Sequence, residues 1–236
     1  MAGHTALIIG ANRGLGLGLL KVFKENGYEV FGTIRAQTRS DPSFKDLQAT
    51  GATIIDLDYL EEETIAAAAE AYGKDRPLSV LVNCAGVEVD PKSWLETTAE
   101  NMVHKYRVMT VGPFLASKYF LPNLQKSKAA KIVNITSEWA SIGGNEANDC
   151  GTYVSYRVPK TALNSLSVTI GLELKAANEN ITVLCLDPGD VPTKLSRWAG
   201  DIKLEDSVRG MHEQIEKATI EDSGLFVNWR GHRWPY

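Results

Sequence analysis

Cysteine is scarce in this sequence, and the few cysteines lie far apart. The chain has 236 residues and three cysteines, Cys84, Cys150 and Cys185, with no C-x-x-C pair among them. Disulfide frameworks and zinc sites need paired or closely spaced cysteines, so the sequence predicts neither and favours a reducing compartment. The histidines are likewise not grouped with carboxylates at metal-ligand spacing, so we expect no metal.

Long apolar runs and an excess of positive charge are also missing. No stretch approaches the roughly 18 apolar residues of a membrane span. The apolar run near the N-terminus, Ala6–Ile9, is too short for a signal peptide. The 25 basic residues are outnumbered by 29 acidic ones, which speaks against a general nucleic-acid binder. We therefore expect a cytoplasmic protein with no membrane or nucleic-acid partner.

What remains is the composition of an ordinary globular protein. Hydrophobic residues make up 44% of the chain and charged residues 23%, as is usual for folded domains. The length alone fits one large domain or two small ones. Because the sequence contains no linker, repeat or low-complexity segment, we predict one domain over residues 1–236.

Short apolar runs alternate with longer segments of helical period. The runs lack polar alternation, which is typical of strands covered on both faces. The seven predicted strands are Thr5–Gly10, Glu29–Ile34, Thr53–Asp56, Val80–Asn83, Lys131–Ile135, Ile181–Leu186 and Leu225–Asn228. The predicted helices are Leu15–Asn26, Glu61–Tyr72, Ala99–Gln125 with a bend or interruption at Pro113, and Tyr153–Asn178. This alternation predicts a doubly wound α/β domain with a mostly parallel seven-stranded sheet and helices on both faces.

A glycine-rich turn joins the first predicted strand to the first predicted helix. Glycines at this place let the chain turn tightly and let a pyrophosphate approach backbone N–H groups at the helix N-terminus. Gly14 and Gly16 stand where a Cβ would collide with the ligand or with the strand beneath. The alternative is an ordinary glycine-rich turn without a ligand. The candidate dinucleotide-binding residues of this turn are Gly10, Asn12, Arg13, Gly14, Leu15 and Gly16.

The end of the second predicted strand indicates which dinucleotide binds. A carboxylate there would suit the ribose 2′-hydroxyl of NAD, whereas arginine suits the 2′-phosphate of NADP. The sequence places Arg35 directly after Ile34, with Arg13 in the glycine turn and Arg39 nearby. We therefore predict NADPH over NADH as cofactor, and the alternative is that these arginines are simply solvated.

Three later motifs follow the glycine turn in order. They are Asp58-Tyr59 after the third strand, Asn83-Cys84-Ala85-Gly86 closing the fourth, and Pro188-Gly189-Asp190-Val191-Pro192-Thr193 after the sixth. With them, nearly the whole chain resembles the short-chain dehydrogenase/reductase family. The stretch Tyr156–Asn164 is similar to the sniffer or C-factor-like branch, which includes ketoreductases of the norsolorinic acid type.

The resemblance implies a Rossmann domain and a cofactor role for each motif. Asp58 and Tyr59 would contact adenine, and Asn83, Ala85 and Gly86 would close the fourth strand beside the cofactor. The backbone of Val191 would meet the nicotinamide carboxamide and Thr193 the pyrophosphate, with Pro188 and Gly189 forming the turn before them.

Tyr156 and Lys160 are four residues apart, so they share one face of a helix. A tyrosine of ordinary pKa, about 10, is a poor acid–base catalyst at neutral pH. A nearby ammonium favours phenolate and lowers that pKa, and the same lysine can hold the nicotinamide ribose. Ser137 stands at the family's place for the serine that orients the substrate. We predict that Ser137 donates to a substrate carbonyl while Tyr156 protonates it, with Tyr156 and Lys160 also binding cofactor.

The segments expected to select the substrate lie at about 138–155 and 190–212. Ser137 and Tyr156 are 19 residues apart, more than is common in the family, because of the insertion Ile142–Thr152. We interpret the insertion as part of the substrate wall, the alternative being a plain surface loop. Trp139 and Trp198 mildly favour a bulky or polycyclic carbonyl substrate.

Two residues depart from the family pattern. Met109 occupies the place of an asparagine that helps carry protons from the lysine to solvent, and a thioether cannot replace an amide in that relay. Pro159 directly precedes Lys160, so the catalytic helix would start late or kink between Tyr156 and Lys160.

The sequence leaves three functional hypotheses. The first is an NADPH-dependent carbonyl reductase acting on a small-molecule carbonyl substrate. The second is the same scaffold used for chemistry without net hydride transfer, as an aldolase, isomerase or cyclase. The third is a non-enzymatic NADP(H)-sensing protein. In each case the aromatic tail Phe226–Tyr236 is interpreted as part of a homodimer or homotetramer interface.

Overall fold

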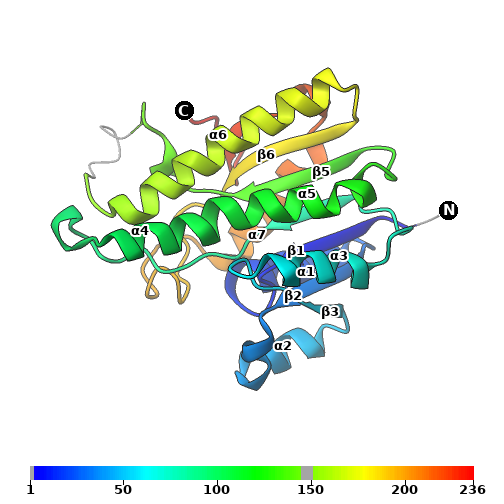
Figure 1. The fold of residues 1–236 in the computed structure, drawn as a ribbon, viewed down its shortest axis with the longest axis horizontal. Helices are drawn as coiled ribbons and strands as arrows, with labels where there is room; N and C mark the ends of the chain where they lie inside the picture. Colours follow the sequence, from blue (N-terminus) through cyan, green and yellow to red (C-terminus); the bar gives the residue numbers. More distant parts are fainter. Residues whose placement is uncertain (1–2, 145–150) are drawn as a thin grey trace.

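Seven parallel strands form the centre of the molecule, in the order β3-β2-β1-β4-β5-β6-β7. The computed structural model describes residues 3–144 and 151–236, and Figure 1 shows the strands running in one direction. The strands are β1 (Thr5–Ile9), β2 (Glu29–Ile34), β3 (Thr53–Asp56), β4 (Val80–Asn83), β5 (Ala130–Ile135), β6 (Ile181–Asp187) and β7 (Phe226–Asn228). The order reverses between β1 and β4, which is where doubly wound sheets bind their ligands.

Helices cover both faces of the sheet, as predicted. They are α1 (Gly14–Glu25), α2 (Ser43–Ala49), α3 (Glu62–Tyr72), α4 (Ala99–Tyr106), α5 (Gly112–Leu124), α6 (Val154–Ala176) and α7 (Leu204–Lys217). In Figure 1, α5 and α6 cross in front of the strands and α7 lies behind them. Neither α2 nor α7 is among the helices predicted from the sequence. The expected substrate loop at 190–212 therefore ends earlier, because α7 begins at Leu204.

The core consists of two apolar layers, one on each face of the sheet. Successive side chains of a strand point to opposite faces, so Leu7 of β1 packs with α3, α5 and α6. Its neighbour Ile8 packs with α1 and α7 instead. All five residues of β1 are buried, which explains its apolar run. The result is a single α/β domain that holds the carboxyl ends of the strands, and the loops leaving them, at one edge of the sheet.

The long helix predicted over Ala99–Gln125 is interrupted where Pro113 was expected to disturb it. A π-helical turn, Arg107–Val111, separates α4 from α5. Proline lacks the N–H that would reach the carbonyl of Met109 four residues earlier, and its ring crowds that carbonyl. The wider π turn relieves both problems, and it lies beside α6.

The helix α6, which carries Tyr156 and Lys160, does not start late, contrary to one of the expectations for Pro159. It begins at Val154 and is helical through Pro159 to Ala176. Tyr153, in the left-handed region at φ 61°, leads into it. Because Pro159 follows the first turn, the helix loses the N–H that would bond the carbonyl of Ser155. Tyr156 and Lys160 nevertheless lie on successive turns of one continuous helix.

Several remaining expectations concern what the chain lacks. In residues 3–144 and 151–236, no helix is long and apolar enough to cross a membrane. The same residues contain no group of three or more side chains suited to a metal ion. Cys84 and Cys185 are free thiols. Cys150 and much of the predicted insertion, residues 145–150, lie outside the described residues.

Candidate active site

Ser137, Tyr156 and Lys160 come together beyond the end of β5. Ser137 precedes a short 3₁₀ turn, Glu138–Ala140, and its hydroxyl accepts the N–H of Trp139 at 3.3 Å. Its side chain also shares a hydrogen bond with Tyr156, which lies in the first turn of α6. The ammonium of Lys160 donates to the carbonyl of Ile135 at 2.6 Å. The strand that ends before Ser137 therefore also anchors Lys160.

Burial dominates the electrostatics of this triad. Tyr156 is 8% exposed and Lys160 is 6% exposed. Burial disfavours a charged side chain, so it raises the pKa of Tyr156, and the charge of Asp187 raises it further, whereas the bond to Ser137 lowers it. Burial lowers the pKa of Lys160 to about 8. The Lys160 nitrogen lies 5.9 Å from the Tyr156 ring centroid. Activation of the tyrosine by Lys160 stays a prediction.

An aromatic wall borders the triad. The rings of Trp139 and Tyr153 are stacked, with centroids 5.1 Å apart, and Trp139 meets Tyr156 edge-on at 6.0 Å. The guanidinium of Arg157 lies 5.2 Å from the Trp139 ring. Trp198, by contrast, is 73% exposed on the loop after β6. Trp139 therefore borders Tyr156, while Trp198 faces solvent.

The π turn supplies a contact to α6 that the sequence pattern does not predict. Met109 is fully buried in the core, so no amide stands at the relay position. The next residue, Thr110, is buried and donates from Oγ1 to the carbonyl of Pro159 at 2.8 Å. A threonine beside Met109 was the only signal for this contact, because its direction depends on the π turn.

The glycine turn leaves room for no side chain at two of its positions. A Cβ on Gly16 would lie 2.1 Å from the carbonyl oxygen of Gly10, and one on Gly10 would lie 2.8 Å from Ala85. Gly10 also has φ +84°, a conformation that favours glycine. Arg13 precedes α1 without capping it, so the first N–H groups of the helix remain for a ligand. This geometry fits a dinucleotide pyrophosphate.

The loop after β6 lies close to two of the predicted cofactor glycines. A Cβ on Gly14 would lie 3.6 Å from Thr193, and one on Gly86 would lie 3.2 Å from Leu195. Gly189 has φ +73°, and Val191 beyond it is buried. Thr193, on the loop after β6, thus lies next to the glycine turn, although β6 is not adjacent to β1 in the sheet. Asn12 lies in the turn between β1 and α1, Leu15 is the second residue of α1, and Pro188 directly follows β6.

The arginines near the second strand have different surroundings. Arg13 and Arg35 are exposed and form no salt bridge within residues 3–144 and 151–236. Arg39 instead pairs with Asp56 of β3 at 2.9 Å. Asn12 donates to Ser43 of α2 at 2.8 Å. Arg35 directly follows β2 and has no such carboxylate partner among the described residues, so it is better placed than Arg39 to bind an anionic ligand.

Two predicted cofactor residues point their side chains into the core. The hydroxyl of Tyr59 donates to Asn83 at 2.8 Å, and Asn83 donates to Asn134 of β5 at 2.7 Å. A contact from Tyr59 to adenine would therefore come from its backbone. Asp58 accepts from the backbone of Leu60 at 3.0 Å and remains partly exposed.

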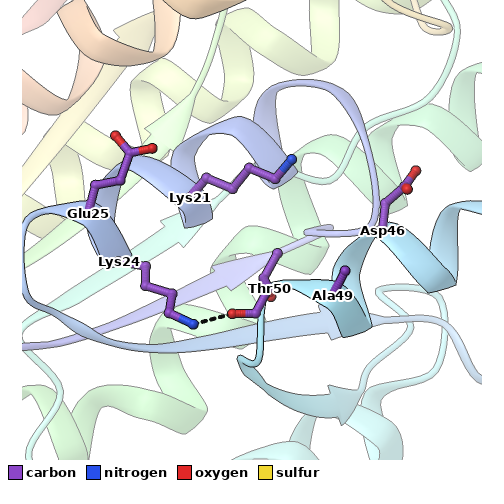
Figure 2. A pocket seen from close by; sticks show the side chains of 6 residues that line it. All are labelled: Lys21, Lys24, Glu25, Asp46, Ala49 and Thr50. Carbon is purple, nitrogen blue, oxygen red and sulfur yellow. Dashed lines mark hydrogen bonds between the residues drawn. The ribbon is translucent and has the colours of Figure 1, made fainter.

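A shallow depression elsewhere on the surface contains none of the predicted site residues. Figure 2 shows it between α1 and α2, with Lys24 donating to the carbonyl of Thr50. Its lining residues are Lys21, Lys24, Glu25, Asp46, Ala49 and Thr50.

A parallel sheet with a glycine turn at its first strand places the chain in the dinucleotide-binding α/β class. More narrowly, it belongs to the short-chain dehydrogenase family, whose family model, "short chain dehydrogenase", matches residues 4–203. The members of this family are oxidoreductases, and the resemblance seen in the sequence is confirmed.

Three known proteins show which relatives this chain is similar to. The structure of an NADPH-bound carbonyl reductase from chicken fatty liver superimposes with a TM-score of 0.92 at 29% identity, covering 100% of both chains. Carbonyl reductase Sniffer of D. melanogaster gives 0.88 at 26% identity, again over 100% of both. C-signal of Myxococcus xanthus is 29% identical, over 68% of this chain and 93% of its own. These matches agree with the sniffer or C-factor-like branch.

Proposed function

We propose that this protein is an NADPH-dependent carbonyl reductase that converts a ketone or aldehyde to an alcohol. The observation that carries the proposal is the Ser137–Tyr156 hydrogen bond next to Lys160, in a buried corner at the same sheet edge as the glycine turn. An acid, a polarising hydroxyl and a cation within one dry corner suit the reduction of a carbonyl group. The carbonyl reductases among its structural neighbours support the same assignment.

The residues present fit the cofactor. The N–H groups at the start of α1 would hold the pyrophosphate, and Arg35 with Arg13 would neutralise the 2′-phosphate. Asp58 and the Tyr59 backbone would border the adenine, and Ala85, Gly86 and Thr193 would line the centre of the site. NADPH bound there would supply the hydride. Support for NADP also comes from the NADPH-bound neighbour.

The chain's own groups would handle the substrate oxygen. Ser137 would donate a hydrogen bond to the carbonyl oxygen and polarise it. Tyr156, whose pKa is raised by burial, holds its proton at neutral pH and would deliver it to that oxygen as the alkoxide forms. Lys160 would hold the ribose and return a proton to Tyr156, because its lowered pKa of about 8 makes its proton easier to release.

The borders of the site support a bulky, apolar or aromatic substrate. Trp139 and Tyr153 form a flat stacked wall beside Tyr156, and flat aromatic surfaces favour rings or extended apolar groups. The loops at 138–155 and after β6 would complete the pocket. We also propose a homodimer or homotetramer in the cytoplasm, and the exposed Trp94, Leu95 and Val103 near α4 support a partner surface.

The proposal is tested by Tyr156→Phe. We expect the purified protein to oxidise NADPH in the presence of quinones or aromatic ketones, and the variant to lose at least a thousandfold in kcat. Its Kd for NADPH should change less than about tenfold, since the phenol supplies only one of the cofactor's hydrogen bonds, which contributes about 0.5–1.5 kcal/mol. Phe in place of Tyr removes only one oxygen, so folding should persist, as circular dichroism would show. Undiminished turnover in the variant would refute the role of Tyr156.

Met109 favours a second candidate function, chemistry without net hydride transfer. Its fully buried thioether leaves no amide at the relay position, and an aldolase, isomerase or cyclase would not need that relay. Such an activity would form product after all nucleotide has been removed. Strict one-to-one consumption of NADPH per product would exclude it.

A further inference from the structure

Asp187, the last residue of β6, is a buried carboxylate that the cofactor motifs do not include. It is 2% exposed. One oxygen accepts the N–H of Gly189 at 3.0 Å, and the other accepts the indole N–H of Trp234 at 3.1 Å. The backbone N–H of Glu138 also donates to it. Because all three partners are N–H donors, they favour the ionised form, although burial raises its pKa.

These three donors come from separate parts of the active site. Glu138 directly follows Ser137 and begins the 3₁₀ turn. Gly189 opens the turn that leads to the buried Val191. Trp234 belongs to the segment after β7, which folds back antiparallel to that strand. The carboxylate of Asp187 therefore joins three segments. They are residues 137–144, which we call the serine loop, the turn at Gly189, and residues 229–236, which we call the last segment.

The last segment also holds the serine loop directly. The backbone N–H of Trp234 donates to the carbonyl of Phe226 in β7 at 2.9 Å, which holds the last segment against that strand. Ser141 donates from its hydroxyl to the carbonyl of Pro235. The N–H of Gly143 donates to the carbonyl of Tyr236 at 3.0 Å. The aromatic tail, expected at an interface between subunits, thus packs on the active-site loop of its own chain.

The charge of Asp187 acts on the catalytic tyrosine as well. It is the second cause, after burial, of the raised pKa of Tyr156. The other charged groups around it are Glu138 on the serine loop, Asp190 on the loop after β6, and Arg157 on α6. Lys160 faces Tyr156 from the next turn of α6. Asp187 is the carboxylate whose charge reaches the phenol.

We infer that Asp187 is a positioning residue of the proposed reductase. Its carboxylate fastens the Ser137 loop to the Gly189 turn and to Trp234, and it is the buried negative charge at the end of β6, beside the corner that holds Tyr156. The inference rests on the proposed function for its catalytic meaning, but both of its physical parts can be measured without turnover.

The test combines Asp187→Asn with Trp234→Phe. The first removes the charge at nearly constant shape, and the second removes one donor and keeps the charge. In protein labelled with ¹³C at tyrosine Cζ, with Tyr156→Phe to assign the signal, Asp187→Asn should lower the titration midpoint of Tyr156 by about one pH unit or more. Trp234→Phe should leave that midpoint within a few tenths of a unit. Amide exchange at Glu138 should become at least tenfold faster in both variants.

Asp190→Asn is the matched control, because it removes an exposed carboxylate next to the same turn. It should move the Tyr156 midpoint much less than Asp187→Asn does. If Asp187→Asn fails to fold, Asp187→Ser serves as a second uncharged variant. An unchanged Tyr156 midpoint, or an equal shift in Trp234→Phe, would overturn the electrostatic part; unchanged Glu138 exchange would overturn the fastening part. A wild type without carbonyl turnover would instead refute the proposed function and leave these shifts interpretable.

Discussion

At the residue scale, the pKa values of two residues of the proposed site are shifted in opposite directions. Tyr156 and Lys160 are both buried in the same corner, and burial moves their pKa values apart, upward for the phenol and downward for the ammonium. Each shift favours the neutral form. Keeping Lys160 charged in this buried site therefore lowers the stability of the fold. We expect the lysine to be retained for its role in the proposed reaction.

Replacing Lys160 by methionine should show this cost directly. The folded-state pKa of about 8 lies below the ordinary value of 10.5, so the charged lysine destabilises the fold at neutral pH. Lys160→Met should therefore be more stable at pH 7, by up to about 3 kcal/mol, while its turnover is lost. As the pH rises from about 8 to 10.5, Lys160 becomes neutral in the folded and then in the unfolded wild type. The difference in unfolding free energy between the wild type and Lys160→Met should therefore shrink. Urea unfolding at pH 7 and at pH 10 measures it; a stability difference independent of pH would contradict the shifted pKa.

Arg35 should decide between the two nicotinamide cofactors. Arg35→Ser removes the exposed cation at the end of β2, and charge-assisted hydrogen bonds contribute about 1.5–3 kcal/mol. We expect kcat/KM for NADPH to fall roughly ten- to a hundredfold, with little change for NADH. Arg39→Ser is the control, because that guanidinium already pairs with Asp56. Equal losses with both cofactors, or an effect of Arg39→Ser as large as that of Arg35→Ser, would contradict this role.

At the element scale, the π turn and α6 act together. The proline at position 113 widens the helix before it, and this brings Thr110 onto the carbonyl of Pro159, one residue before Lys160. One hydrogen bond thus joins the π turn before Pro113 to Pro159 in α6. The sequence indicated the disturbances, but the partner of Thr110 depends on how two distant helices pack.

Thr110→Val tests this contact. Valine has nearly the same shape but leaves the buried contact without its hydroxyl donor, so we expect a loss of about 1–2 kcal/mol in the free energy of unfolding and a lower kcat through displacement of Lys160. The control is Thr169→Val, which removes a similar threonine bond, to Ser165, on the exposed side of α6. Equal effects of the two substitutions on kcat would show that Thr110 has no special place.

Local signals explain which elements could be predicted. The seven strands were found because each is a short apolar run, and the main helices because Gly27 and Gly73 end two of them and periodicity marks the rest. The helix α7 is rich in charged and polar residues, so its apolar residues Val208, Met211 and Ile215 were overlooked, although their spacing of three and four is helical. The short α2 lacks any such pattern.

At the scale of the whole molecule, the candidate site is assembled from segments far apart in the chain. Motif spacing was enough to predict Ser137, Tyr156 and Lys160 together. It could not predict that Tyr59 and Asn83 join a buried hydrogen-bond network. Asp187 and Trp234 were also missed, because a carboxylate before a Pro-Gly turn and an aromatic tail acquire meaning only once β6 and the last segment lie side by side.

The most direct test of the central claim follows the hydride itself. The protein would be given NADPH carrying deuterium at nicotinamide C4, on the transferred face, together with a ketone substrate, and the alcohol would be analysed by mass spectrometry. We expect one deuterium on the carbinol carbon for each NADPH oxidised, and no product from Tyr156→Phe. Product formed without deuterium, or formed after the nucleotide has been removed, would contradict carbonyl reduction by this site.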